Sequence, residues 1–285
     1  MRESVLNGNR EETRRIVHEG RAVWVRVEGD ALVLGDGRRV AAESALHLPP
    51  CEPTKILAIH LNYPSRRKEF GIEGTTTPTY FQKPTTSLNS HGGAIPRPAN
   101  CTYLNYEGEL AVVIGSPMRN VAPDAVWEYI AGFTAANDVG CHDFRDTDNG
   151  GMTRVKGMDG FCPLGPGLVR GIDPRRSRIR TYINGAVVQE GVVGELDFGI
   201  DYLVADLCRH ITLLPGDVIL TGTPANSRPM QVGDVVEVEI EGIGRLSNRV
   251  VECPAPAHEI GFQPTDSQNV RAVALGLGRR GGMTS

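Results

Sequence analysis

Two glutamates that flank a glycine, Glu107-Gly108-Glu109, stand at the start of an apolar run in this chain. Side chains two residues apart on a strand point the same way, so both carboxylates would lie on one side of a buried strand. Gly108 is expected to leave the opposite side open. Asp138 ends a second apolar stretch and adds a third carboxylate. Carboxylates crowded in this way require a cation or a proton, and their hard oxygens suit magnesium or manganese. A solvated strand end is the alternative for the Glu-x-Glu pair taken alone.

Two further segments carry polar side chains that could contact a substrate. Lys156 lies in the glycine-rich segment 139–160, which is expected to be a site loop, and could balance a substrate carboxylate or stabilise an enolate. Thr223 follows an apolar strand within Thr-Gly-Thr-Pro, where backbone N–H groups and a hydroxyl could hold a carboxylate. A solvated lysine and an ordinary strand exit remain the alternatives at these two positions.

The composition excludes several classes of protein. The chain has 285 residues and 40% hydrophobic residues, enough for one large domain or a domain with a small appendage. The net charge is −4 and the basic residues are scattered, so no nucleic-acid surface is expected. No apolar run is long enough to cross a bilayer, and the N-terminus has no apolar signal-peptide core, which predicts a cytoplasmic protein. The six cysteines form no C-x-x-C pair and are expected to be reduced, small apolar residues.

Hydrophobic patterning predicts a mixed α+β, β-rich chain of three parts. Residues 1–52 are expected to form a small N-terminal β-rich domain, residues 53–258 the main domain and residues 259–285 a C-terminal tail on the surface. Segment 64–80, called the lid segment below, reads as a mobile loop or a short helix. The predicted strands cover 22–27, 31–34, 55–59, 109–114, 131–137, 179–183, 218–220, 235–240 and 245–251, and the predicted helices cover 122–129 and 200–211.

From about residue 54 to 252 the chain resembles the fumarylacetoacetate hydrolase superfamily. The resemblance rests on an ordered set of motifs rather than on any one of them. Residues 242–251 are most similar to the bacterial isomerase/decarboxylase branch that acts in homoprotocatechuate breakdown. The motifs are Leu61-Asn62-Tyr63, Phe81-Gln82-Lys83-Pro84, Tyr106–Gly115, Tyr129–Phe133, Asn137-Asp138, Val155-Lys156, Asp159–Pro163, Asn184-Gly185, Leu214–Asp217 and Thr221–Pro224.

This resemblance implies a mixed β-sandwich roll with a small N-terminal domain, usually as a homodimer. It implies that Glu107, Glu109 and Asp138 bind Mg²⁺ or Mn²⁺, that Lys156 is the active-site lysine and that Thr223 holds substrate. The other candidate substrate-binding residues are Arg66, Tyr63, Lys83 and Asp159.

The chain departs from the family pattern in the lid segment and after the third ligand. The lid of the family often carries a histidine where this chain has Arg66, whereas the glutamate three residues on is kept as Glu69. Beyond Asp138 the usual Arg-Asp pair is His142-Asp143, and the glycine common after Thr-Gly-Thr-Pro is absent from residues 225–227. Arg66 suggests a substrate with an extra carboxylate, or else a solvated lid residue.

The lost histidine bears on the reaction because, in the hydrolases, it works with the glutamate to activate water. Hydrolysis therefore lacks its obvious base here, unless His142 or His60 replaces it, and either histidine could instead have a packing role. Decarboxylation and keto–enol isomerisation do not need an activated water, since a metal that chelates an oxo-acid stabilises the enolate. Glu69, Lys156 and His142 are the candidate catalytic residues.

Three hypotheses of function follow. The leading one is a divalent-metal-dependent isomerase or decarboxylase of a small unsaturated oxo-diacid in aromatic-compound catabolism. The second is an acylpyruvase or fumarylacetoacetate-type hydrolase of a C–C bond. The third is a non-catalytic relative that only binds a metabolite.

Overall fold

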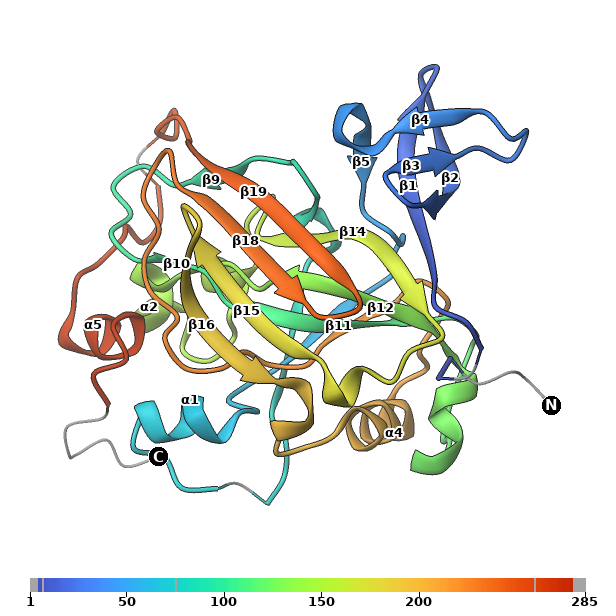
Figure 1. Ribbon diagram of the computed structural model, residues 1–285. Helices are drawn as coiled ribbons and strands as arrows, with labels where there is room; N and C mark the ends of the chain where they lie inside the picture. The colour runs from blue at the N-terminus through green and yellow to red at the C-terminus, as the bar shows by residue number, and fades with distance from the viewer. Residues whose placement is uncertain (1–4, 7, 75, 259, 279–285) are drawn as a thin grey trace.

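Two packed β-sheets form the framework of the molecule, with short helices at their edges (Figure 1). The computed structural model describes residues 5–6, 8–74, 76–258 and 260–278. The expected mixed α+β, β-rich sandwich is confirmed within these residues.

The large sheet has twelve strands, in the order β4-β3-β2-β1-β14-β12-β11-β17-β6-β7, with β5 paired to β1 and β8 to β14. It is mixed, because β17 runs parallel to β6 and β8 parallel to β14 while the other pairs are antiparallel. Its strands are β1 Glu11–His18, β2 Arg21–Glu28, β3 Ala31–Val33, β4 Arg39–Ala41, β5 Leu46–Leu48, β6 Ile56–Ile59, β7 Tyr80–Lys83, β8 Leu88–Ser90, β11 Gly108–Ile114, β12 Ile130–Asn137, β14 Cys162–Arg170 and β17 Val218–Leu220.

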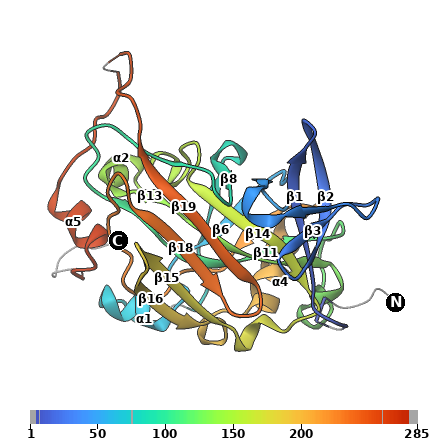
Figure 2. The same cartoon turned by 45° about the horizontal axis from the view of Figure 1, so that its top comes forward.

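A second sheet of five strands, in the order β16-β15-β18-β19-β9, covers one face of the large sheet, as both views show (Figure 2). Its strands are β9 Ile95–Arg97, β15 Arg178–Ile183, β16 Ala186–Val192, β18 Val235–Ile240 and β19 Gly244–Glu252. Asn184 and Gly185 form a two-residue hairpin turn between β15 and β16, and both have the positive φ that this turn requires. A separate ribbon pairs β10 Leu104–Asn105 with β13 Gly140–Cys141.

Helices lie at the ends and edges of the sheets. The predicted helix at 200–211 is confirmed as α4, and the helix expected at 122–129 is a 3₁₀ helix, η3. Segment 139–160 is less loop-like than expected, because it contains β13, η4, α2 and α3. The helices are α1 Pro64–Glu69, α2 Arg145–Asp148, α3 Thr153–Lys156, α4 Ile200–His210 and α5 Gln268–Ala274, and the 3₁₀ helices are η1 Ala42–Ser44, η2 Thr85–Ser87, η3 Pro123–Glu128, η4 His142–Phe144, η5 Pro174–Arg176 and η6 Val193–Glu195. Within the described residues no helix is long and apolar enough to cross a membrane.

All predicted strands are present, but ten further strands among the described residues were not predicted, of which β1, β7, β14 and β16 are the longest. Strand β14 contains Pro163 and Pro166, which as sequence indicate a loop rather than a strand. Strand β1 has the sequence Glu-Glu-Thr-Arg-Arg-Ile-Val-His, and its many charged residues obscure the alternation of apolar and polar residues that predicts a strand. Because β1 pairs with β14, the N-terminal strands continue the large sheet. The expected domain boundaries after residues 52 and 258 stay predictions.

The alternation of side chains on β11 gives this strand two different buried faces. Leu110, Val112 and Ile114 join the core that includes residues of the second sheet and α4. Ala111 and Val113 face the other way, into a core with β6, β17 and β14. Glu109 precedes Ala111 by two residues and therefore lies on this second face, away from the second sheet.

Gly108 does not leave the opposite side of β11 open, so that expectation was wrong. A Cβ atom built there would clash with Thr181 Oγ1 and come within 3.2 Å of Val238 Cγ1, both in the second sheet. The glycine is required because the second sheet leaves no room for a Cβ atom beside the glutamates.

We predict that Gly108→Ala lowers the free energy of unfolding by about 1–3 kcal/mol, the usual cost of overpacking a core. Urea denaturation measures it. Gly35→Ala is the matched control, because a Cβ there meets nothing within 4 Å. Equal stability of the two variants would show that the sheets can separate at no cost.

Candidate active site

A cavity of about 130 Å³ opens on the face of the large sheet that lies away from the second sheet. Its walls come from β6 and the lid segment, from the start of β11 and the end of β12, from segment 139–160 and from the C-terminal residues. The lining residues are Ile59, His60, Leu61, Arg66, Phe70, Ile72, Phe81, Glu107, Glu109, Asp138, His142, Arg145, Met152, Lys156, Thr223, Asn269, Ala272, Val273 and Gly278.

Three buried carboxylates form the floor of this cavity. Glu107 and Glu109 are brought beside Asp138 by the antiparallel pairing of β11 with β12, in which Gly108 is opposite Asn137. One oxygen from each carboxylate lies within 4.8 Å of the others, and the residues are only 8%, 2% and 2% exposed. The structure therefore brings together the three predicted metal ligands.

Two lysines partly neutralise this charge. Lys156 Nζ lies 2.8 Å from Glu107 Oε2 and 2.9 Å from Asp138 Oδ2, and Lys83 Nζ lies 2.7 Å from Asp138 Oδ1. Burial alone would lower the pKa of Lys156, but the carboxylates of Asp138 and Glu107 outweigh it and raise the pKa. Lys156 is thus held as a cation between two carboxylates, and Lys83 pairs with Asp138.

The negative charge of Glu109 is the one that nearby cations compensate least. Its Oε2 accepts the Gly222 N–H at 2.7 Å, while the two lysines contact Glu107 and Asp138. Burial, and then the charges of Asp138 and Glu107, raise the pKa of this carboxyl well above its usual range. A divalent cation would relieve that repulsion, and three carboxylates are the oxygen donors that Mg²⁺ or Mn²⁺ prefers. The residues present therefore fit such an ion.

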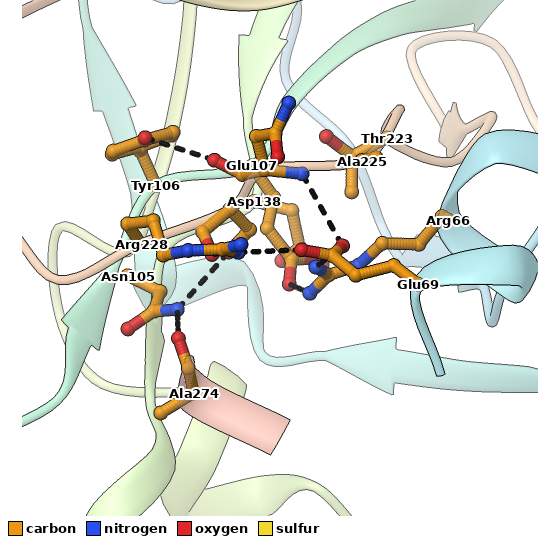
Figure 3. Close-up of polar contacts among 12 residues, drawn as sticks. Arg66, Glu69, Asn105, Tyr106, Glu107, Asp138, Thr223, Ala225, Arg228 and Ala274 are labelled. Carbon is orange, nitrogen blue, oxygen red and sulfur yellow. Dashed lines mark hydrogen bonds and ion pairs between the residues drawn. The ribbon is translucent and has the colours of Figure 1, made fainter. Parts of the chain in front are cut away.

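Helix α1 of the lid segment covers one side of the carboxylates (Figure 3). Arg66 is 3% exposed, and its guanidinium lies 2.6 Å from Glu69 Oε2 and 3.4 Å from Glu107 Oε1. Glu69 also pairs with Arg228 at 2.6 Å and accepts the Asn226 N–H at 3.2 Å. Arg66 is thus not a solvated lid residue. Glu69 is not among the lining residues, since its carboxylate is held between two arginines.

Two histidines line the cavity. His142 is 2% exposed, and neither ring nitrogen has a hydrogen-bond partner among the described residues. Burial, then the charges of Lys156 and Arg145, lower its pKa well below the usual range. Burial also lowers the pKa of His60, to about 4. At neutral pH both rings are uncharged and are weak proton acceptors, which suits a hydrogen-bonding role better than that of a strong base.

Thr223 lines the cavity and is held by a glutamine that the sequence reasoning missed. The side-chain amide of Gln189, on β16, donates to Thr223 Oγ1 at 3.1 Å. Its carbonyl accepts the Gly108 N–H at 3.2 Å and the Thr181 hydroxyl at 2.9 Å. One buried side chain therefore connects the threonine to the Glu-x-Glu segment at the start of β11. No motif in the sequence around Gln189 points to this role.

The remaining predicted site residues lie outside the cavity wall. Tyr63 is 1% exposed and buried beneath the site, and Lys83 acts through Asp138. Asp159 is exposed on the turn before β14 and is not among the lining residues. Of the predicted set, Arg66, Glu107, Glu109, Asp138, His142, Lys156 and Thr223 share the cavity.

The similarity to known proteins coincides with this site. Residues 55–251 match the family described as fumarylacetoacetate (FAA) hydrolase C-terminal. The chain belongs to the fumarylacetoacetate hydrolase family. An Archaeoglobus fulgidus protein named only "Uncharacterized protein" is 42% identical over 226 residues, which cover 79% of this chain and 90% of that protein.

Two relatives with named activities are also similar. The 4-hydroxyphenylacetate degradation bifunctional isomerase/decarboxylase of Salmonella dublin is 38% identical over 199 residues, covering 69% of this chain and 46% of that longer enzyme. The crystal structure of 5-carboxymethyl-2-hydroxymuconate delta-isomerase from Mycobacterium smegmatis has a TM-score of 0.79 and 37% identity, and the match covers 85% of this chain and 99% of that one. The expected fold and family are thereby confirmed.

We predict that the His142 ring stays neutral between about pH 5.5 and 8, because burial and nearby cations disfavour its charged form. The carbon shift of its ring in histidine-labelled protein measures this, and His142→Asn assigns the resonance. A midpoint near the ordinary value of about 6.5 would make His142 a competent base.

Proposed function

We propose that this chain is a divalent-metal-dependent isomerase or decarboxylase of a small unsaturated oxo-diacid in the catabolism of aromatic compounds. The observation that carries the proposal is the cluster of Glu107, Glu109 and Asp138, buried together beside Lys156 in one cavity. Similarity to isomerase/decarboxylase enzymes supports the reaction class.

Glu107, Glu109 and Asp138 would hold Mg²⁺ or Mn²⁺, and the bound ion would supply Lewis-acid stabilisation to a developing enolate. Lys156, fixed between Glu107 and Asp138, places a positive charge at the cavity floor where an oxo-acid carboxylate would lie. Thr223 offers a hydroxyl oriented by Gln189. The apolar walls formed by residues such as Phe70 and Phe81 exclude water and strengthen these electrostatic contacts.

The proton transfer is proposed for Glu69. Its Oε2 contacts Arg66, which faces the cavity, so breaking the Arg66–Glu69 pair on substrate binding would release this oxygen from Arg66 at the edge of the site, while Arg228 still holds Oε1. A second carboxylate on the substrate would be a suitable partner for the released Arg66 guanidinium. One such carboxyl group suffices to move a proton between two carbons or, in its protonated form, to deliver a proton to the carbon that has lost carbon dioxide.

Two broader predictions accompany this proposal. The family resemblance implies a homodimer, and the sequence predicts a cytoplasmic location with no nucleic-acid or membrane partner. Sedimentation of the purified chain measures the first, and cell fractionation the second.

We predict that Glu109→Gln lowers the affinity for Mn²⁺ by at least about a hundredfold and abolishes activity, because a ligand charge is lost without a change of shape. Calorimetry measures the affinity, and circular dichroism checks the fold. Glu241→Gln, at an exposed position, is the control. Unchanged Mn²⁺ affinity in Glu109→Gln contradicts the ligand assignment. Tight metal and oxo-acid binding with no turnover would favour the metabolite-binding hypothesis.

We predict that Arg66→His raises acylpyruvate hydrolysis relative to oxaloacetate decarboxylation by about tenfold or more, since a histidine beside Glu69 supplies a base for water. Product analysis by chromatography measures both reactions. Arg67→His is the matched control, because Arg67 is the next residue on α1 and pairs with Asp197 instead. If the unsubstituted enzyme already hydrolyses acylpyruvates far faster than it decarboxylates or isomerises any oxo-acid, the hydrolase hypothesis is correct.

A further inference from the structure

Residues 260–278, called the C-terminal cap below, form part of the cavity wall although they lie beyond residue 251, where the family match ends. The cap contains α5, which lies beside α2 in both ribbon views (Figures 1 and 2). Asn269, Ala272, Val273 and Gly278 of the cap line the same cavity as the carboxylates. The tail expected to wrap the surface thus contributes to the candidate site.

The cap is docked by buried contacts rather than lying loosely over the cavity. Val270 and Ala274 are fully buried and pack against Tyr103. The Tyr103 hydroxyl donates to Asp266 at 2.7 Å, and Asn269 donates to Asp146 at 2.6 Å.

The end of α5 is held from the floor of the site (Figure 3). Asn105 is fully buried, and its amide donates to the Ala274 carbonyl at 2.8 Å and to Ser227 Oγ at 3.1 Å. Asn105 lies two residues before Glu107, so the cap is fixed to the segment that supplies the metal-ligand candidates.

The cap also packs against the lid segment. Gly276 has φ 63°, and a Cβ atom there would clash with the Glu69 carboxylate and come within 2.9 Å of Arg228. A Cβ on Gly278 would lie 3.6 Å from the Glu69 carbonyl oxygen. The cap and α1 therefore close the cavity from two adjoining sides.

One face of α5 points at the space where the far end of a substrate would lie. Asn269, Ala272 and Val273 have the i, i+3, i+4 spacing that places side chains on one helix face. The oxo-carboxylate end of a substrate would be held at Lys156 and the carboxylates of the same cavity. Small side chains at 272 and 273 thus set how far the ligand can extend.

The volume left by this arrangement is small. A cavity of about 150 Å³ accommodates a benzene-sized molecule, and this one is about 130 Å³. We propose that the C-terminal cap determines the length of substrate that this enzyme accepts, and that the cap favours oxo-diacids of four or five carbons over longer ones. This inference rests on the proposed function, because it assumes that an oxo-acid binds at the carboxylate floor.

The test measures binding of oxalate, 2-oxoglutarate and 2-oxoadipate by calorimetry with Mn²⁺ present. Ala272→Leu is expected to weaken the binding of 2-oxoadipate by about tenfold or more and that of oxalate by less than about threefold. Adding or removing a methylene group in a pocket changes affinity by factors of this size. Val273→Ala is expected to increase the affinity for 2-oxoadipate relative to that for 2-oxoglutarate. Gln268→Leu is the matched control, since it adds the same side chain to an exposed position of α5 outside the cavity.

The outcomes separate the two proposals. In one outcome, the unsubstituted protein binds Mn²⁺ and these acids, while Ala272→Leu and Val273→Ala change the affinities for all three acids equally or not at all. That result overturns the role of the cap and leaves the proposed function standing. If the unsubstituted protein binds none of the acids with Mn²⁺, both are overturned. Should Ala272→Leu fail to fold, Val273→Ala decides, because it only removes atoms from the cavity wall.

Discussion

Crowding of three carboxylates on one buried face of the large sheet is the constraint on which the rest of this structure depends. Burying a single unpaired charge is costly, and burying three of like sign within 4.8 Å requires cations around them. The chain provides Lys83, Lys156 and Arg66 for that purpose. The compensation is unequal, and the strongly raised pKa of Glu109 marks the position where a divalent ion would contribute most.

The same constraint explains the packing beneath the site. Strand β11 carries glutamates on one face, so its other face must supply the hydrophobic contacts that hold the two sheets together. The sheets meet so closely at Gly108 that only a glycine fits, and Gln189 satisfies the backbone N–H exposed there. By binding Thr223 as well, Gln189 makes the geometry of the cavity depend on the second sheet.

Closure of the cavity relies on charge as much as on shape. Arg66 occupies the place where the family often has a histidine, and it connects the lid glutamate to the carboxylate floor. Arg228 and the backbone at Asn226 hold Glu69 from the other side, and Gly276 of the C-terminal cap packs against it. The lid, the cap and the floor are therefore coupled through one ion-paired glutamate, and a substrate with an additional carboxylate could compete for its arginines.

The sequence by itself determined those features that are encoded locally. Alternation and apolar runs predicted nine strands and α4, and a Glu-x-Glu spacing placed two carboxylates on one strand face. Ordered motifs then identified the family and supported Asp138 and Lys156 as candidate site residues. Each of these signals depends on residues that are neighbours along the chain or on a pattern shared by relatives.

Only the tertiary structure decided the contacts between distant segments. The pairs Lys83–Asp138, Gln189–Thr223 and Asn105–Ala274 depend on sheet register and on docking, which no local spacing reveals. The buried thiols of Cys101 and Cys141 lie 3.3 Å apart although 40 residues separate them in sequence. Strand β14 was not predicted, and the C-terminal cap was expected to be a surface tail, because their prolines, glycines and polar residues are compatible with burial only once the partner strands and Tyr103 are in place.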